Sequence, residues 1–443
     1  MTRRSRRAFL AGSASGLAAL AGCSSLPFGG GGRRDVTYDG ERLREVADPA
    51  AVAVPASYPG PVPDALADAH VERARALLDG VPRDVSFPNE AVERRLADER
   101  ERVADGLSEA PADGATLYDL DSLRYDRGEA AELRAAYDAA SGDADAARLR
   151  RRRDAVRDDL GALQEAWTYR GRTAAEAFAV HRRLESLAAT GGRYLVPDRR
   201  FPADPQSAVF AAGEVAADVE RARAAVADAT GLRDAYVDDG MDAYWSDLGT
   251  AASRLERAIY PTRRPVEQYV AVDARPSDFE RDLDGTPAHR LFVEARRVVL
   301  GAENRAEDAV ERGHHASAVA ACARTLLGLV AMSPVAAAIR DGEYGVPEST
   351  DAVVDARERA VDAVERAASV EPRPVADVLA RRARWQLRDG DESLSVQRDY
   401  ESDAPTRRDV VDAVGQYALA VHLADAVPAV AERVTAELRG RAQ

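Results

Sequence analysis

From Pro63 onward, apolar residues recur three and four positions apart among charged residues, which is the spacing of one face of an α-helix. Two segments carry this pattern with particular regularity. In residues 91–107 the apolar positions are Val92, Leu96, Val103 and Leu107, and in residues 352–370 they are Val354, Val361, Val364 and Ala368. The same segments are rich in strong helix formers. We therefore predict an all-α fold, built as a multi-helix bundle or as stacked helical hairpins.

Glycine and proline residues divide this pattern into separate helices, because both interrupt regular structure. The expected breaks are Gly142, Gly191-Gly192, the region of Pro202 and Pro205, residues 238–240, and Pro261, Pro265, Pro276 and Pro287. Residues 266–272 alternate in a strand-like way, but so short a segment beside prolines predicts a loop or an isolated strand. The pattern does not support a sheet.

One helical hairpin is recognisable around Gly313, where a helix ends near Arg312 and a second begins at about His315. It resembles a tetratricopeptide hairpin in architecture only, because the aromatic positions of that repeat and its period of about 34 residues are missing. Stacked pairs of helices are a common way to build a long helical chain with few aromatic residues.

The two most apolar stretches of the body are residues 316–339 and 410–430. Both are long enough to raise the question of a membrane span, but Arg324 interrupts the first and Asp425 the second. A charged residue at the centre of a span costs about 2.5 to 3.5 kcal/mol on insertion scales. We therefore expect both stretches to form the core of the C-terminal half.

The N-terminus carries a different pattern, a basic start followed by an uncharged stretch. It resembles the signal for twin-arginine export at the positions that define that motif, namely Arg6, Arg7, Phe9 and Leu10. The uncharged residues 8–22 are too few to span a bilayer comfortably and predict the apolar part of a signal peptide. The resemblance implies that the body folds inside the cell before the twin-arginine translocase exports it.

The uncharged stretch ends in Leu20-Ala21-Gly22-Cys23, which resembles the lipobox of exported lipoproteins. The resemblance implies cleavage before Cys23 and its lipidation, and two long chains hold a protein stably on a membrane. An uncleaved N-terminal anchor and ordinary signal cleavage are the alternatives. The residues after Cys23, including Gly29 to Gly32, predict a flexible tether. We therefore expect a lipid-anchored protein at the outer face of the cell membrane.

These observations divide the chain into a leader, a tether and a body with the length of about two or three domains. The expected parts are a signal peptide at 1–22, the lipidated cysteine and flexible tether at 23–60, an N-terminal helical region at 61–200, a helical region at 204–262, a proline-rich connection at 263–287 and a C-terminal helical region at 288–441.

The charge of the chain indicates its environment. Against 76 acidic residues stand 61 basic ones, and loss of the four leader arginines would move the net charge from −15 to −19. The basic residues are all arginine, and the acids are spread along the chain, a composition that resembles haloarchaeal proteins. A GC-rich genome explains the lack of lysine equally well, so the acid excess is the better indicator of strong salt, which screens self-repulsion. The same screening opposes nucleic-acid binding, and we expect no such partner.

The chain contains two cysteines. If Cys23 carries lipid, Cys322 has no intrachain partner, so an internal disulfide is excluded. Cys322 shares an apolar helix face with Val319 and Leu326, which predicts a buried, inert thiol.

The histidines and acids form no recognisable metal-binding motif. Asp119 and Asp121 suggest a calcium loop, but Arg124 stands where an EF-hand needs glycine. The neighbours His314 and His315 would point about 100° apart on a helix and could not chelate one ion together. A nucleophile elbow and a phosphate-binding loop are also missing. We therefore expect neither a metal nor another cofactor, and the catalytic residues, if any, stay unassigned.

Side chains that could line a pocket occur near Gly240 and around the proline-rich connection. The candidates are Tyr244, Trp245, Tyr269 and His314. Core packing is the simpler interpretation of the aromatic residues, as it is for Trp167, Tyr169, Tyr236 and Trp385. The arginine run between Arg148 and Arg157 is interleaved with acids at helical spacing and predicts an ion-paired, exposed helix.

Two functions follow from this pattern. The first is a surface-tethered lipoprotein whose non-enzymatic body binds or scaffolds another component, with an envelope protein as candidate partner. The alternative is an extracellular enzyme or solute-binding receptor with a site between helical halves, near residues 261–287, because ligand sites favour domain interfaces. A deep pocket that gathers the candidate residues would favour the alternative, whereas an exposed apolar groove would favour the first.

Overall fold

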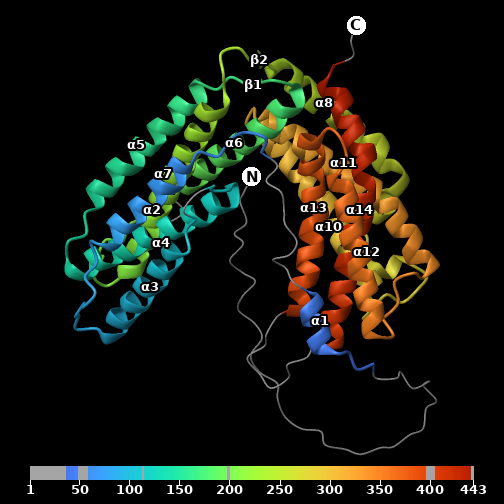
Figure 1. Cartoon of the computed structure of the whole chain (residues 1–443), viewed down its shortest axis with the longest axis horizontal. Helices are drawn as coiled ribbons and strands as arrows, with labels where there is room; N and C mark the ends of the chain where they lie inside the picture. The colour runs from blue at the N-terminus through green and yellow to red at the C-terminus, as the bar shows by residue number, and fades with distance from the viewer. Residues whose placement is uncertain (1–35, 48–57, 112–113, 197–199, 396–404, 441–443) are drawn as a thin grey trace, which may run out of the picture. The chain divides into compact units, whose positions relative to one another are not determined.

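The computed structural model describes residues 36–47, 58–111, 114–196, 200–395 and 405–440. Nearly all regular structure within these ranges is α-helical (Figure 1). The exception is a short antiparallel ribbon in which β1 (Arg170–Gly171) pairs with β2 (Asp242–Ala243). The predicted all-α, multi-helix fold is therefore confirmed, with this ribbon as an addition that the apolar spacing did not indicate.

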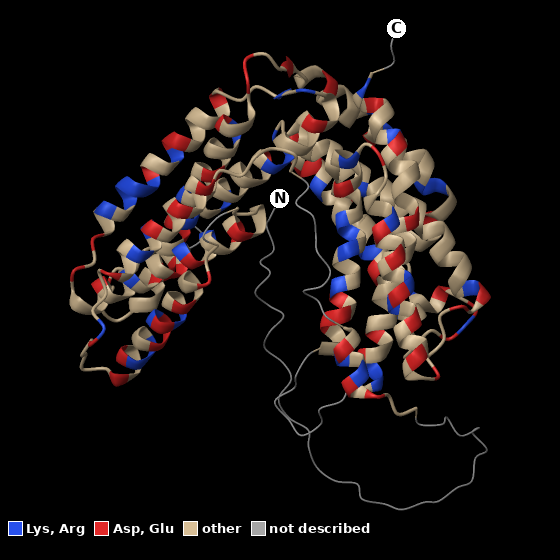
Figure 2. Cartoon of the chain, viewed as in Figure 1, with Lys and Arg blue, Asp and Glu red and all other residues tan. Residues whose placement is uncertain are grey.

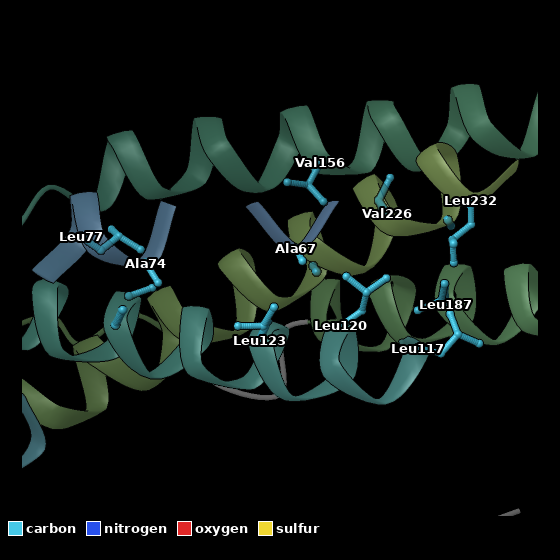
Figure 3. Close-up of a cluster of buried hydrophobic side chains, with 14 of the residues drawn as sticks. Ala67, Ala74, Leu77, Leu117, Leu120, Leu123, Val156, Leu187, Val226 and Leu232 are labelled. Carbon is cyan, nitrogen blue, oxygen red and sulfur yellow. The ribbon is translucent and has the colours of Figure 1, made fainter. Parts of the chain in front are cut away.

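The first group of helices packs around α4 and α7. Its members are α2 (Asp64–Leu78), α3 (Glu90–Ser108), α4 (Leu117–Ser141), α5 (Ala146–Glu165), α6 (Ala174–Leu195) and α7 (Val209–Tyr236). Helix α4 contacts α2, α3 and α7, and α7 also contacts α5 and α6. The side chains between them, among them Leu120 and Leu232, are fully buried (Figure 3).

The second group packs around α11 and α14. Its members are α8 (Trp245–Arg263), α10 (Pro287–Glu311), α11 (His315–Asp341), α12 (Thr350–Ala368), α13 (Arg373–Ser395) and α14 (Arg407–Leu438), with the short turns η1 (Arg264–Val266), α9 (Glu267–Val270) and η2 (Pro276–Asp278) between α8 and α10. Helix α14 contacts α10 to α13, and α11 contacts α8 and α10. Helix α6 of the first group contacts α11 and α13, so it belongs to both cores.

Local signals set where several helices begin. Thr116 and Asp119 form a capping box at the start of α4, and Thr406 and Asp409 form another at the start of α14. Ser349 accepts a hydrogen bond from the Ala352 N–H at the start of α12. Each such cap satisfies backbone N–H groups that the helix leaves without partners, and losing one costs about 1 kcal/mol.

Several predicted boundaries are confirmed. The segments expected at 91–107 and 352–370 are α3 and α12, which match to within two residues at each end. Gly142 ends α4 with a φ of 82°, and Gly313, with a φ of 69°, separates α10 from α11 as the predicted hairpin requires. Both glycines adopt the left-handed conformation that other residues avoid.

Two predicted breaks are wrong, because helices continue through them. Helix α6 runs through Gly191-Gly192, where a methyl group on Gly191 would lie 2.9 Å from a Val226 methyl group on α7. Glycine at this position therefore permits close packing of two helices and does not end one. Helix α8 likewise continues past Pro261 to Arg263.

The structure also corrects the predictions for two connecting segments. Residues 266–272, expected as a loop or isolated strand, include the last residue of η1 and the single turn α9. Within residues 23–60, expected to be a flexible tether, α1 (Gly40–Val46) packs on α12 and α13. Its anchor is Tyr38, whose hydroxyl donates to the Pro347 carbonyl at 2.8 Å.

The predicted helical region 204–262 is divided between the two groups. Helix α7 packs with α4 and α6, whereas α8 packs with α11 and α14. The division falls between Tyr236 and Trp245, at the connection that contains β2, and not within the proline-rich connection 263–287.

The two most apolar stretches lie inside α11 and α14. These are the two described helices that are long and apolar enough to cross a membrane, but 72% and 78% of their most apolar windows are buried within the body. The expectation that they form the core of the C-terminal half is therefore confirmed. Cys322 on α11 is fully buried and free, as predicted, and burial raises the pKa of its thiol to about 12.

Acidic and arginine residues are interspersed along most of the helices (Figure 2). Helix α5 contains the arginine run between Arg148 and Arg157, and most of its side chains are exposed. Arg148 lies 3.4 Å from Asp138, and Arg157 lies 2.7 Å from Asp154. The run is therefore exposed, as predicted, and the predicted ion pairing is seen at Arg148 and Arg157.

Candidate functional site

The four residues predicted as pocket candidates lie on different elements and contact different neighbours. Tyr244 and Trp245 follow β2, and the Tyr244 N–H donates to the Tyr169 carbonyl at 2.9 Å. Tyr269 lies on α9 and stacks on Phe279, with ring centroids 5.5 Å apart. His314 immediately precedes α11. The candidates therefore do not form one site.

Of the aromatic residues for which core packing was the simpler interpretation, some are buried and others are exposed. Tyr236 and Tyr169 are buried. Trp245, by contrast, is 61% exposed, and its ring meets His315 edge-on at 5.5 Å. Trp385 is also exposed, beside the Arg388 guanidinium. The core interpretation is therefore wrong for Trp245 and Trp385.

The contact of α6 with α11 is organised by Glu185, which the sequence did not single out. This buried carboxylate accepts hydrogen bonds from the Tyr169 hydroxyl at 2.6 Å and from the backbone N–H groups of Ala316 and Ser317 at 3.1 and 2.6 Å. It thus caps the N-terminus of α11 from another helix. Burial raises the pKa of Glu185 to about 7, against these hydrogen bonds, which lower it.

Next to Glu185 lies a cavity of about 200 Å³ between α6, α10 and α11. Four arginines line it: Arg182 from α6, Arg305 from α10, Arg312 immediately after α10, and Arg324 from α11. His314 also lines it, so one of the four predicted candidates is at this site. We call this the arginine cavity. Sequence reasoning used Arg324 only as an argument against a membrane span, although a lone charge in an apolar helix was the available signal.

A second concentration of charge, the ionic network, is buried among the first group of helices. His70 Nε2 lies 2.8 Å from Asp228, and the Arg127 guanidinium donates to His70 Nδ1 at 3.3 Å. Since arginine can only donate, Nδ1 accepts and the ring proton lies on Nε2. Arg127 also pairs with Glu220 at 2.7 Å, and Arg124 pairs with Asp228 at 2.5 Å.

The His70 and Asp228 pair has the composition of a catalytic dyad but not its accessibility. Both side chains are about 1% exposed. Both ring nitrogens of His70 are engaged, so the nitrogen that would take a proton from a substrate faces Arg127. The ionic network therefore acts in folding, by holding α2, α4 and α7 together.

Another cavity, of about 570 Å³, lies at the N-terminal ends of α10 and α14. It is lined by Gly285, Thr286, His289, Arg290, Val293, Arg407, Arg408, Val411 and Asp412. Its first two residues belong to the proline-rich connection where the alternative function placed a ligand site. Arg408 is 87% exposed, and Arg290 lies 3.4 Å from Glu294, so the basic groups of this cavity are solvated or already paired.

Among the residues that the structure describes, no group of three or more histidine, cysteine or carboxylate side chains is placed so that it could hold a metal ion. Asp119, considered for a calcium loop, instead caps α4. The leader residues Arg6, Arg7, Phe9, Leu10 and Leu20 to Cys23 lie outside the described residues.

Comparison with known proteins divides the chain where the helix packing does. Residues 65–243 match the profile of a family described as a domain of unknown function (DUF8262), and residues 245–436 match a second such family (DUF8264). The two matches meet at Tyr244, between β2 and α8. No curated protein and no solved structure matches the chain. The arginine cavity therefore takes residues from both matched regions.

Proposed function

We propose that the protein is a lipoprotein exported by the twin-arginine route and anchored through Cys23 to the outer face of the cell membrane. Its helical body binds or scaffolds another component of the cell envelope. The order and spacing of the leader motifs support the export and the anchor. During export its partner is the twin-arginine translocase, and afterwards the membrane, through the lipid.

The position of α1 is consistent with a short tether. About 15 residues separate Cys23 from Tyr38, which is held to Pro347. Fully extended, such a segment reaches at most about 54 Å, and as a coil about 20 Å. Helix α1 is also held by the Arg42 pair with Asp351 at 2.6 Å. A lipid on Cys23 would therefore keep the end of the body that carries α1 close to the membrane.

One observation favours binding over catalysis: four guanidinium groups reach the arginine cavity, whereas its buried carboxylate, Glu185, is already engaged by Tyr169 and the N-terminus of α11. Arginine stays protonated at neutral pH and binds anions, whereas proton transfer needs groups that titrate near neutrality. Glu185, whose pKa burial raises to about 7, is buried and engaged by protein groups, and both ring nitrogens of the buried His70 are also engaged. The body therefore presents binding chemistry at its accessible cavity.

The same cavity favours a solute-binding receptor as the second candidate function. Arg182 lies in the first matched region, whereas Arg305 and Arg324 lie in the second. A ligand in this cavity would contact both, which is the arrangement expected of a site between helical halves. The catalytic version of this alternative has no comparable observation in its favour.

We further infer that the protein works in strong salt. Its dispersed acidic excess opposes compaction by self-repulsion, which dissolved ions screen. Thermal unfolding in increasing potassium chloride should give a rising midpoint that levels off at molar salt. A midpoint independent of salt would argue for an ordinary acidic protein.

Cell fractionation tests the anchor. Cys23→Ser should move the protein from the membrane fraction to the soluble exterior, whereas Cys322→Ala, which removes the other thiol, should leave it on the membrane. Replacing Arg6 and Arg7 by lysine should hold the chain inside the cell. If the Cys23→Ser protein stays in the membrane fraction, lipid anchoring is wrong.

Recovery of the anchored protein from its membrane in native salt tests the scaffolding role. We expect an envelope protein to be retained after crosslinking and to be lost when the body is released by Cys23→Ser. Recovery of the anchored protein alone would contradict scaffolding and would leave the solute-binding receptor as the better proposal.

A further inference from the structure

The arginine cavity has more positive than negative charge along its walls. Besides the four arginines, the described part of its lining contains two carboxylates, Glu185 and Asp308. Glu185 is engaged by Tyr169 and by the N-terminus of α11. Asp308 is largely exposed and lies 3.8 Å from Arg312. Neither carboxylate therefore balances Arg305 and Arg324.

More guanidinium groups lie behind this wall, on α13. Burial, together with the positive charges of Arg305, Arg381 and Arg382, lowers the pKa of Arg324 to about 10. Burial also lowers the pKa of Arg182, as do the charges of Arg324 and Arg381, whereas the Glu185 carboxylate raises it. Arg305 and Arg324 are thus held near other guanidinium groups, which is unfavourable unless an anion lies between them.

We propose that the arginine cavity binds a compact tetrahedral oxyanion, a phosphate group or its close analogue sulfate, through Arg182, Arg305 and Arg324. These residues approach from three helices, and a tetrahedral anion presents acceptor oxygens in several directions, whereas a carboxylate presents two in one plane. A cavity of about 200 Å³ has the volume of roughly seven water molecules, which suits a small anion and excludes a folded partner.

Binding of a phosphate group in this cavity does not require the lipid on Cys23. The proposal is therefore independent of the proposed export and anchoring of the protein. Two sources of a phosphate group are available at a membrane surface: a free ion or ester in solution, and a lipid headgroup. Chloride competes for the same arginines in brine, but a phosphate group carries more charge, about −1.5 to −2 at neutral pH, and offers several acceptor oxygens.

Calorimetric titration of the full chain carrying Cys23→Ser, at constant molar chloride, measures binding directly. Inorganic phosphate should bind at one site per chain, and acetate should bind much more weakly. Arg324→Gln and the exposed Arg305→Gln should each weaken phosphate binding about tenfold or more, because each removes a charge-assisted contact. Arg388→Gln, which removes an arginine paired with Glu392 at 2.8 Å on α13, is the matched control and should bind like the parent.

Thermal unfolding distinguishes a binding role from a structural one. Without phosphate, Arg324→Gln should unfold at the same temperature as the parent or higher, because it relieves repulsion between like charges. Phosphate should raise the unfolding temperature of the parent and of Arg388→Gln but not that of Arg324→Gln. The proposal is overturned if Arg324→Gln unfolds at a lower temperature than the parent and phosphate changes the unfolding temperature of neither protein. Arg324 would then serve folding.

Sedimentation with vesicles separates the two sources of the phosphate group. A soluble ligand is supported if the parent binds free phosphate and if Arg305→Gln and Arg388→Gln bind vesicles of anionic phospholipid with the same affinity. A vesicle affinity that falls in Arg305→Gln alone supports a headgroup. If Arg305→Gln matches Arg388→Gln with both free phosphate and vesicles, the cavity is not an oxyanion site.

Discussion

In the ionic network, each buried arginine lies against a carboxylate. In the arginine cavity, guanidinium groups outnumber carboxylates. Arg124 and Arg127 pair with Asp228 and Glu220 in the network. In the cavity, Arg324 experiences mainly the positive charges of other arginines. The two regions contain the same residue type on helices of the same body, and they differ in whether charge is balanced within the chain.

The difference separates arginines that stabilise the fold from arginines that await a ligand. A buried, matched ion pair is strongly destabilising to break, because the remaining charge has no partner. A surplus of like charge has the opposite property, since removing one member relieves repulsion. Burial of a charged residue by itself therefore does not indicate function, but the sign and number of its neighbours do.

The largest effect is expected in the ionic network. Asp228→Asn removes the carboxylate shared by His70 and Arg124, and should lower the free energy of unfolding by about 3 to 5 kcal/mol. Denaturant unfolding followed by circular dichroism measures this change. Asp234→Asn, an exposed position on the same helix, should change it by less than about 0.5 kcal/mol. Equal effects at the two positions would mean that the network is not specially stabilising.

Glu185 should make stability depend on pH in a defined direction. Its folded-state pKa of about 7 lies above its ordinary value of 4.5, so its contribution is present below pH 4.5 and is lost as the pH rises through 7. Relative to Glu185→Gln, the parent should lose on the order of 3 kcal/mol of unfolding free energy over this range. His181, whose pKa burial lowers to about 4, titrates in both proteins and cancels in the difference. Parallel pH profiles would contradict the assignment.

The same substitution at Arg127 and at Arg324 compares an arginine of the ionic network with an arginine of the arginine cavity. Arg127→Gln should reduce the unfolding free energy by about 2 kcal/mol, since Glu220 keeps its second partner, Arg73. Arg324→Gln should leave the unfolding free energy unchanged or raise it. Chemical denaturation of the two variants in the same phosphate-free buffer compares them. A loss of equal size in both would show that balanced and unbalanced arginines serve the fold alike.

The smallest effect is expected at Trp245, which is exposed despite its size. Trp245→Ala should change the unfolding free energy by less than about 0.5 kcal/mol. Phe292→Ala, a fully buried aromatic residue, should cost about 3 to 5 kcal/mol and serves as the contrast. A large loss at Trp245 would mean that its edge contact with His315 supports the start of α11.

Much of the fold could be predicted because its signals are local. Val354 and Val364, which the apolar spacing selects, lie on the buried face of α12, and Gly142 and Gly313 end helices through their own backbone conformation. Gly191 shows the limit of such reasoning. Its role depends on Val226 of α7, which approaches it in the folded chain, and nothing in the residues beside Gly191 indicates that neighbour.

The candidate site could be predicted only in part, for the same reason. Tyr244, Trp245, Tyr269 and His314 were chosen for their residue types, and only His314 lines the arginine cavity. Glu185 was overlooked because its importance comes from capping a helix more than a hundred residues away. An acid in an acidic chain gives no local sign of such a contact.

The sequence by itself determined the helical class of the body, the limits of many helices and the expected export signal and lipidation site in residues 5–23. Those features depend on neighbouring residues, whose spacing and chemistry can be read along the chain. Only the tertiary structure decided that Asp228 is a matched partner and Arg324 an unmatched one. Each belongs to a group of charges drawn from separate helices, and whether a buried charge is balanced depends on which side chains packing brings within a few ångströms of it.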